Sequence, residues 1–465
     1  MPAAARSAPG KPGFLDEHDR DSVDDRVKAA ARHTEDARAV RKLPNGPTAG
    51  GAAQDFDQAR VERHGEPPTG SRARYTPFDT KEQRTAPILR VMLALPPPLR
   101  EAIEARGSGL AILVLRLGAM GDIVRTLPAV RLVRSGLPDA RIHWVAWEPW
   151  GQLLADHPDV DSVVGLPRSE LRAFVRSPLA WPSLVGATGR IISELRSLRA
   201  GLVLDFHGDL RTGLLGRLSG APVRLGYFGH QQKEGNRVFT THRVPSGDRR
   251  TPRLERNLDL VAALGLPVRP IPDAGIAIGP ADAGAAREIV RSLVGGDGTY
   301  AILNPGASRR QAFKKPPAPL FAAAAHALAD HHISSIVVCG PGEEEDAARV
   351  VEAASGRALC APATTLKSLA ALLHGARVFV GGDSGPLHLA CGVGCPVVGI
   401  YGPTDPVVNT PWNVQFVALV RPGSAHTGIK AKDRATEGFD GLAPDAVADA
   451  IHDILERPRS ASPAP

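Results

Sequence analysis

Cysteine is scarce in this sequence. The 465 residues include only four cysteines, Cys339, Cys360, Cys391 and Cys395. Cys391 and Cys395 are too far apart for a CxxC redox pair, and no second pair of ligands is present to complete a zinc site. Cys339 and Cys391 stand among apolar residues, where cysteine acts as a small hydrophobic side chain. We therefore expect a reducing compartment, the cytoplasm.

Long hydrophobic runs and aromatic residues are also few. No stretch approaches the ~18 apolar residues that a membrane-spanning helix needs, and the N-terminus lacks the apolar core of a signal peptide. Aromatic residues make up 5% of the chain, but 43% of it is hydrophobic, which is enough for buried cores. The sequence therefore predicts a protein that is soluble or, at most, peripheral on a membrane.

Acidic residues do not balance the basic ones. The chain has 56 Lys and Arg against 49 Asp and Glu, a formal net charge of +7 and a pI of about 9.4. This balance favours anionic partners such as nucleotides, phosphorylated lipids or an acidic membrane surface. A genome that uses arginine freely would give the same composition, so charge alone does not distinguish these explanations.

Composition and periodicity divide the chain into segments. Residues 1–88 are rich in Pro, Gly, Arg, Asp and Ala without a lasting period, and we predict that they are disordered, like residues 457–465. Short apolar runs then alternate with helical stretches, first AILVLRL, RIHWVAW, GLVLDFHG and RLGYFG, and later YAILNPG, SIVVCGPG, RVFVGGD and PVVGIYGP. Such runs are typical of parallel sheets that are buried on both faces. We predict an α/β protein with two Rossmann-like, doubly wound domains, 89–280 and 281–456, that face each other across a cleft.

The turn after the first strand, VLRLGAMGDIVR, contains Gly118, Gly121 and Asp122. A dinucleotide-binding turn would read GxGxxG, whereas this one supplies only GxxG. Only Glu148 stands near the end of the next strand to bind a ribose hydroxyl, so the oxidoreductase interpretation is weak. By spacing alone, the favoured role of Asp122 is to cap the N-terminus of the following helix.

A longer motif, VGGDSGPLHLACGVGCPVVGIYGPTDP, covers residues 380–406. A strand ends there in GGDSG, and a helix begins near Pro386. Consecutive glycines let backbone N–H groups converge on an anion, and the helix N-terminus adds its dipole. Ser384 can donate to a phosphate oxygen, and His388 lies one turn into the helix. We predict a phosphate site here; the alternative is a tight turn capped by Asp383.

Two further strand ends carry polar residues. After ILNPGAS comes the basic segment RRQAFKK (residues 309–315), in which a cation could neutralise a leaving diphosphate. The alternative is a solvated basic loop. In VVCGPGEEE, the glutamates are ordinary partners of a helix dipole, although one of them could bind a ribose instead.

Basic residues also follow a strand of the first series. Asp205, His207 and Arg211 lie beyond LVLD, and with Arg168 and Arg172 they could form a basic wall for an anionic acceptor. Surface arginines are an equally good explanation.

Two DxD pairs are present, Asp159/Asp161 and Asp55/Asp57. Neither pair lies beside the phosphate motif, so we predict no metal site.

Taken in order, these motifs resemble glycosyltransferase family 9, the heptosyltransferases of lipopolysaccharide core assembly. The resemblance runs from about residue 111 to residue 455 and rests on RLGAMGDIVRTLPAV, LDFHGDLRTGLLGRL, NPGAS, a lysine–proline segment before LFAAAAHAL, CGPGEEE and GGDSGPLHLACGVGCPVVGIYGPTDP. It implies a GT-B fold, in which an acceptor domain precedes a nucleotide-sugar domain. It also implies an inverting transfer that needs neither a metal nor another cofactor.

The resemblance assigns roles to individual residues. It implies that Asp122 is the general base and that Lys314 lies near the donor phosphates. The implied donor-binding residues are Ser308, Glu343, Asp383, Ser384, Gly385 and His388, and the implied acceptor-side residues are Arg168, Arg211 and Gly121.

Two positions depart from the family pattern. The lysine segment usually reads lysine–x–tryptophan–proline, but this chain has KKPP, which leaves the choice between Lys314 and Lys315 open. Ser384 stands where threonine is usual.

We therefore expect a cytoplasmic enzyme that transfers a heptose from ADP-heptose to an anionic glycolipid of the lipopolysaccharide core. It would contact the inner face of the cytoplasmic membrane transiently and bind no nucleic acid. Three alternatives stay open at this point: a different nucleotide sugar, a Rossmann-type oxidoreductase or epimerase, and a non-catalytic nucleotide-binding protein of the same fold.

Overall fold

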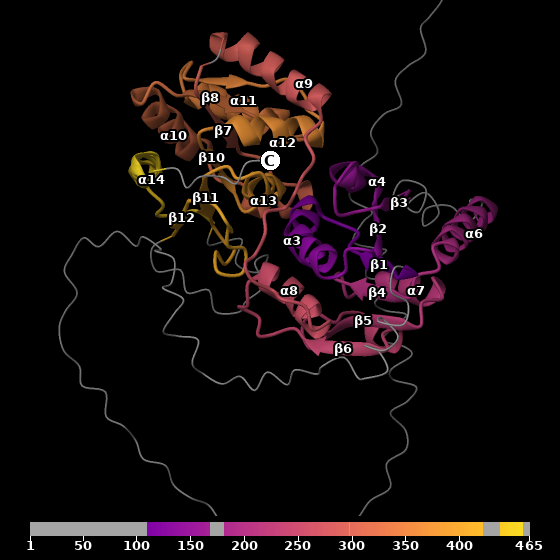
Figure 1. Ribbon diagram of the computed structural model, residues 1–465. Coiled ribbons are helices and arrows are strands. Elements are labelled where there is room, and N and C mark those ends of the chain that lie inside the picture. Colours follow the sequence, from indigo (N-terminus) through magenta and orange to yellow (C-terminus); the bar gives the residue numbers. More distant parts are fainter. Residues whose placement is uncertain (1–108, 168–180, 297, 422–437, 459–465) are drawn as a thin grey trace, which may run out of the picture.

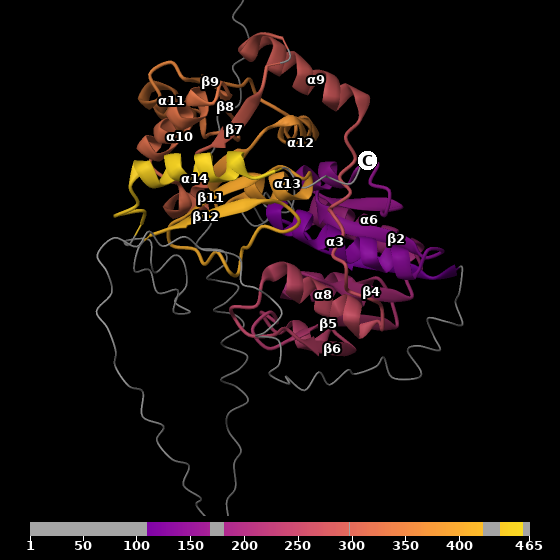
Figure 2. The same cartoon turned by 60° about the vertical axis from the view of Figure 1, so that its left-hand side comes forward.

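A computed structural model describes residues 109–167, 181–296, 298–421 and 438–458. Residues 1–88 and 459–465 of the two predicted tails, together with Arg168 and Arg172, lie outside these residues, whereas Arg457 and Pro458 of the second predicted tail are described. The described residues form two α/β halves that lie against each other (Figures 1 and 2).

The first half is built on a six-stranded parallel sheet in the order β3-β2-β1-β4-β5-β6. The strands are β1 (Ala111–Leu115), β2 (Arg141–Trp147), β3 (Ser162–Leu166), β4 (Leu202–Asp205), β5 (Val223–Phe228) and β6 (His242–Pro245). The connecting helices are α3 (Met120–Gly136), α4 (Glu148–Gly151), η3 (Gln152–Leu154), α6 (Trp181–Ser197), α7 (Leu210–Leu218), η5 (Asn236–Val238) and α8 (Arg253–Ala263).

The second half repeats this topology. Its sheet has the order β12-β11-β10-β7-β8-β9, which, read from β9, is the same doubly wound sequence as in the first half. The strands are β7 (Tyr300–Asn304), β8 (Ser334–Val337), β9 (Ala358–Cys360), β10 (Phe379–Gly382), β11 (Val397–Tyr401) and β12 (Phe416–Val420). The helices are α9 (Pro280–Val290), η6 (Arg291–Gly295), η7 (Arg309–Lys314), α10 (Ala318–Asp330), α11 (Glu344–Ala353), α12 (Leu366–Gly375), α13 (Gly385–Gly392) and α14 (Pro444–Glu456).

The central strands are buried throughout, because helices cover both faces of each sheet (Figure 1). All five side chains of β1 and all five of β7 are buried, which explains why both strands read as uninterrupted apolar runs. This confirms the predicted architecture of two Rossmann-like parallel sheets. The division at residue 280 stays a prediction.

The four strands at the sheet edges, β3, β6, β9 and β12, differ from the sequence prediction, which did not contain them. Each has exposed or half-buried positions, as in β6 and the three-residue β9. An edge strand is covered less completely, so its sequence lacks the continuous apolar run that identifies a central strand.

The two halves meet along α3 and α13, which lie side by side in Figures 1 and 2. Glycines allow the close approach. A Cβ atom built on Gly121 of α3 would lie 2.6 Å from the His388 ring, and one built on Gly392 of α13 would lie 2.7 Å from Val124. The two helices therefore approach closely, with glycine on one helix facing a side chain of the other.

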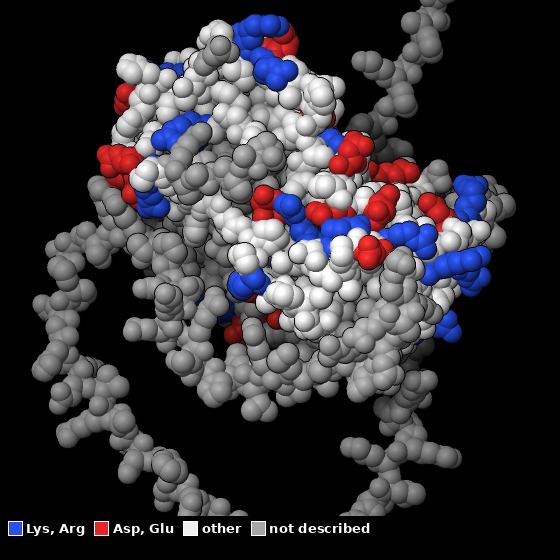
Figure 3. Space-filling view, in the orientation of Figure 1, with Lys and Arg blue, Asp and Glu red and all other residues white. Residues whose placement is uncertain are grey.

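The face seen in Figure 3 carries acidic and basic side chains that are interspersed over α3. Arg131 and Arg134 of α3 pair with the loop that follows η3, through Asp159 at 3.1 Å and Asp161 at 2.5 Å. In the part of the chain that the structure describes, no helix combines the length and the apolarity needed to cross a membrane.

Candidate active site

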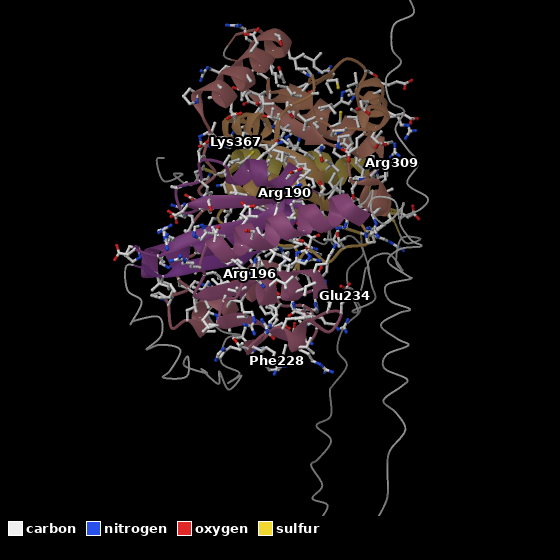
Figure 4. The ribbon with its side chains drawn as sticks, turned by 90° about the vertical axis from the view of Figure 1, so that its right-hand side faces the viewer. Arg190, Arg196, Phe228, Glu234, Arg309 and Lys367 are labelled. Carbon is white, nitrogen blue, oxygen red and sulfur yellow. The ribbon has the colours of Figure 1, made fainter. Side chains whose placement is uncertain are left out.

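The predicted functional residues gather at the topological switch points of the two sheets. In register, Leu115 of β1 lies opposite Asp205 of β4, and Asn304 of β7 lies opposite Gly381 of β10. The loops that follow these four strands therefore emerge next to each other in pairs, where doubly wound sheets bind ligands. Arg309, after β7, and Glu234, after β5, lie on the same side of the molecule, away from Lys367 (Figure 4).

Asp122 is the third residue of α3, and the structure corrects its predicted role as a helix cap. Ala119 occupies the N-cap position, and no side chain caps this helix. The Asp122 carboxylate Oδ1 instead accepts from three arginines, Arg116 at 2.9 Å, Arg125 at 2.7 Å and Arg253 at 3.4 Å. The Asp122 side chain is 20% exposed, so the carboxylate stays accessible at the edge of the sheet.

The charge state of Asp122 follows from two opposing effects. Burial raises the pKa of this carboxyl, but the guanidinium groups of Arg116, Arg125 and Arg253 outweigh burial and bring the pKa well below its usual range. Asp122 is therefore ionised at neutral pH. It is a weak base, suited to an oxygen whose proton becomes acidic during bond formation.

Arg125 connects this carboxylate to the second half of the molecule. Its side chain is buried, and its Nη2 donates to Asp122 while its Nη1 donates to Asn409 Oδ1 at 2.9 Å. Its Nε also donates to the carbonyl of Gly121 at 3.1 Å. The orientation of Asp122 thus depends on a contact that crosses between the two halves.

The loop after β4 is organised by Asp205. This buried carboxylate accepts from the backbone N–H groups of His207 and Gly208 and from the side chains of Thr212 and Asn236, at 2.8–3.1 Å. The donors are uncharged, and burial raises the pKa of Asp205.

Two residues that the sequence analysis singled out, His207 and Arg211, follow β4. His207 Nε2 lies 3.2 Å from the carboxylate of Asp209, which also accepts from Arg211. Arg211 is 58% exposed and pairs with Asp209, and its predicted role in an acceptor wall stays a prediction.

In the second half, the loop after β10 leads directly into α13. Ser384 occupies the N-cap position but does not cap the helix, because its hydroxyl donates to Asn304 Oδ1 at 3.4 Å. The first N–H groups of α13, beginning at Gly385, have no side-chain cap, and such groups bind anions. Ser384 and Gly385 are both half-buried, so these groups are accessible.

Asp383 points away from the predicted donor. Its side chain is 3% exposed, and its carboxylate is 3.0 Å from Lys314 Nζ and 3.4 Å from His388 Nε2. Burial raises the pKa of Asp383, but Lys314, His388 and Arg125 together outweigh burial and hold the pKa below its usual range. Asp383 thus fixes Lys314 beside the N-terminus of α13.

The geometry also separates the two adjacent lysines. Lys314 contacts the loop that begins α13, whereas Lys315 pairs with Asp346 of α11. Lys314 is therefore the lysine that the structure places beside the predicted phosphate site.

Gly121 and His388 contact each other. Both are buried, and the His388 ring packs on Gly121 where α3 meets α13. Burial, and then the nearby charge of Arg125, lower the pKa of His388 to about 4, so the ring is neutral at neutral pH. The structure gives these two residues a role in joining the halves, and their predicted contacts with acceptor and donor stay predictions.

Glu343 and Ser308 lie on the same edge of the second sheet. Glu343 accepts from the backbone N–H of Gly340 at 2.9 Å, and its carboxylate packs directly against Gly306, where any side chain would collide with it. Ser308 is exposed at the start of η7. Both are placed where a bound nucleotide could contact them.

No group of three metal-ligating His, Cys, Asp or Glu side chains occurs among the residues that the structure describes. Asp159 and Asp161 of the DxD pair are engaged by Arg131 and Arg134.

The sequence analysis missed Arg116, Arg125, Arg253 and Asn409. Arg125 follows Asp122 at i+3 in a helix, a spacing that predicts their ion pair. Arg253 and Asn409 come from distant segments, so only the fold reveals them.

Comparisons with known proteins show the family and the fold. The model of glycosyltransferase family 9 (heptosyltransferase) matches residues 188–436, more than half of the chain. Lipopolysaccharide heptosyltransferase 3 of Escherichia coli is 26% identical over 308 residues, which cover 64% of this chain and 86% of the relative. Two crystal structures share the fold at 22% identity: a family 9 glycosyltransferase from Veillonella parvula (TM-score 0.63; 74% of this chain, 97% of that one) and E. coli heptosyltransferase WaaC with ADP (TM-score 0.58; 74% and 100%).

Proposed function

This chain belongs to glycosyltransferase family 9, the heptosyltransferase family, and is a glycosyltransferase; we propose that it transfers a heptose from ADP-heptose to an anionic glycolipid of the lipopolysaccharide core. One observation carries the proposal. The ionised Asp122 of α3 and the uncapped N-terminus of α13 belong to opposite halves, and the two helices are in contact. A proton acceptor and an anion site thus face the same space from two sides.

We infer that the reaction is a single in-line displacement that inverts the anomeric centre. The acceptor hydroxyl attacks the anomeric carbon, the bond from that carbon to the diphosphate breaks, and Asp122 takes the hydroxyl proton. The low pKa of Asp122 suits a late proton transfer, because the attacking oxygen becomes strongly acidic as its new bond forms.

The leaving ADP carries the developing negative charge. Lys314 and the N–H groups that begin α13 are positioned to receive this charge, and prearranged donors of this kind lower the barrier of such reactions. Because this chain supplies its own cation, we expect transfer to proceed without a metal ion.

The choice of donor rests on the relatives. The WaaC structure contains ADP, and a second structure of the same enzyme contains an ADP-heptose analogue. We propose that residues 281–456 bind the nucleotide sugar and that residues 89–280 bind the acceptor. In this arrangement the enzyme works in the cytoplasm and contacts the membrane that holds the glycolipid.

The test compares Asp122→Asn with Asp139→Asn, a control at an exposed aspartate. Transfer from ADP-heptose should fall about 10²–10⁴-fold in the first variant and stay unchanged in the second. Calorimetry should show that both variants still bind ADP, and that wild-type protein binds ADP more tightly than UDP or GDP. Equal turnover in Asp122→Asn would refute the base, and turnover that disappears in a chelator would refute the metal-free mechanism.

A further inference from the structure

A second group of polar side chains lies at the same edge of the first sheet, next to the Asp122 site. Arg256 belongs to the second turn of α8, His230 follows β5, and Ser246 follows β6. The side chains of Arg256 and Ser246 are 5% and 2% exposed. None of the three has a place in the mechanism above.

Arg256 is a buried cation that forms no ion pair with a described residue, although the charge of Asp248 acts on it. Its Nη2 donates to the carbonyl of Arg249 at 2.7 Å, but its Nε is buried and has no hydrogen-bond partner in the described part of the chain. Among the described residues, no carboxylate lies within ion-pair distance of this guanidinium. A buried charge in this state is costly unless an anion completes the site.

His230 presents a second unused donor. Its Nδ1 lies 3.1 Å from the Ser246 hydroxyl, while its Nε2 is buried and has no partner among the described residues. In the tautomer in which the hydroxyl donates to Nδ1, the ring proton sits on Nε2 and has no acceptor, and a bound anion would select this tautomer. Two buried N–H donors, one of them charged, therefore lack acceptors in neighbouring positions.

The surroundings are positive as well. The charged groups that face His230 are Arg256, Arg249, Lys233 and a single acid, Asp248. Burial, and then the charges of Arg256 and Arg249, lower the pKa of His230.

We propose that Arg256, His230 and Ser246 form an oxyanion site that holds a phosphate or carboxylate group of the acceptor. The proposal rests on the proposed function, since it names a feature of the acceptor. The guanidinium donates to two oxygens of the anion, and His230 Nε2 donates to a third position.

The position of the site gives it a role in selecting the acceptor. Arg253 is 3.4 Å from Asp122, and Arg256 follows Arg253 at i+3, so the two side chains are neighbours on α8, about 5–6 Å apart at their Cβ atoms. An anion on Arg256 would hold the sugar with a nearby hydroxyl at Asp122. Acceptors with the charged group close to the reacting hydroxyl should therefore be preferred.

The first experiment measures the binding of inorganic sulfate by calorimetry in the presence of saturating ADP, so that the proposed phosphate site at α13 is already occupied. The variants are Arg256→Met, His230→Phe, and the control Arg217→Met at an exposed arginine of α7. Sulfate should bind wild type and Arg217→Met equally, about 10–100-fold more weakly to Arg256→Met, and several-fold more weakly to His230→Phe. Wild-type affinity in a folded Arg256→Met variant would overturn the proposal. If that variant does not fold, unchanged affinity in His230→Phe would overturn it instead.

A pH series separates this site from a purely structural role. A bound anion favours protonated His230, so sulfate, whose charge is constant between about pH 5 and 8, should bind more tightly as the pH falls. His230→Phe should remove this dependence. A pH dependence that persists in His230→Phe would contradict the assignment of the second donor.

The final arm uses transfer kinetics. At saturating ADP-heptose, which fills the proposed anion site at α13, sulfate should compete with the glycolipid, and Arg256→Met should raise the acceptor KM about tenfold or more with little change in kcat. Enzymatic removal of the acceptor phosphates tells whether the site holds a phosphate or a carboxylate. Asp122→Asn should lower transfer about 10²–10⁴-fold and still bind sulfate, so failure of the proposed reaction and failure of this site give different results.

Discussion

Three aspartates show how the partners of a buried carboxylate, rather than burial itself, decide its charge. Asp205 accepts from backbone, Thr and Asn donors, and its pKa is raised. Asp122 is surrounded by arginines, and its pKa is lowered. Asp383 is paired with Lys314, and its pKa is lowered too. Several positively charged partners together therefore exceed the cost of desolvation here, whereas the donors around Asp205 do not.

Lys314 and Lys315 provide a test at the scale of single residues. Lys314→Met should weaken ADP binding at least tenfold, because the cation beside α13 is lost, whereas Lys315→Met should leave ADP binding unchanged. Calorimetry measures both affinities.

Stability provides the control for this pair. Lys314→Met also leaves the buried Asp383 without its cation, which costs about 3–5 kcal/mol, and the double variant Lys314→Met/Asp383→Asn should recover most of this loss. If the double variant also regained ADP affinity, Lys314 would be a structural residue.

His388 should make stability depend on pH. Its pKa is about 4 in the folded protein and 6.5 in the unfolded chain, so the unfolded state binds the extra proton between these values. The free energy of unfolding should therefore fall as the pH drops from about 6.5 towards 4, by at most ~1.4 kcal/mol per pH unit from this group. Urea denaturation at pH 7 and pH 5 should show a smaller loss in His388→Gln than in wild type; an equal loss would contradict the neutral ring.

At the scale of elements, glycines set the contact between α3 and α13. Gly392→Ala would place a Cβ 2.7 Å from Val124 and 3.2 Å from both Ala274 and Ile276, so the free energy of unfolding should fall by about 1–3 kcal/mol. Gly385→Ala should cost less, because its nearest atom is the mobile end of Met120.

Gly284→Ala is the matched control for these substitutions. Gly284 lies in α9 with open space around its Cβ position, so alanine should stabilise the helix by ~0.5–1 kcal/mol. Thermal unfolding ranks the stability of the three variants. An equal loss of stability in Gly392→Ala and Gly284→Ala would refute the tight contact.

The central strands could be predicted from the sequence, because burial on both faces leaves continuous apolar runs such as AILVL and YAILN. The edge strands could not, because half-exposed sequences such as HRVP carry no such run. Asp122 and Lys314 could be named because each stands in a local motif. Arg253 and Asn409 could not, because their proximity to Asp122 and Arg125 comes from pairing of distant segments.

At the scale of the molecule, polar contacts join the halves on more than one side. Arg125 donates to Asn409, Arg250 lies 3.3 Å from Asp405, and Lys367 donates to the carbonyl of Ala155 at 2.6 Å. Arg125, which donates to Asn409 across the halves, also donates to Asp122. The relative position of the halves and the orientation of the proposed base are therefore linked.

Asn409→Ala tests this link. The variant removes the acceptor of Arg125 Nη1 from the second half and leaves the Arg125–Asp122 pair in place. We expect kcat to fall about tenfold, because the variant loses about one hydrogen bond to a charged group. The donor KM should stay unchanged. Small-angle X-ray scattering should show a larger radius of gyration, and an unchanged radius together with unchanged kcat would exclude the coupling.

The meeting of α3 and α13 has a mechanical consequence. Because Gly121 touches the His388 ring one residue away from Asp122, rotation of one half on the other would have its pivot almost at the reacting groups. Atoms close to the axis of such a rotation would move little, whereas the parts of the two halves farthest from the axis would move most. A rotation about this contact would thus change the separation of the outer parts of the two halves while Asp122 stays close to the N-terminus of α13.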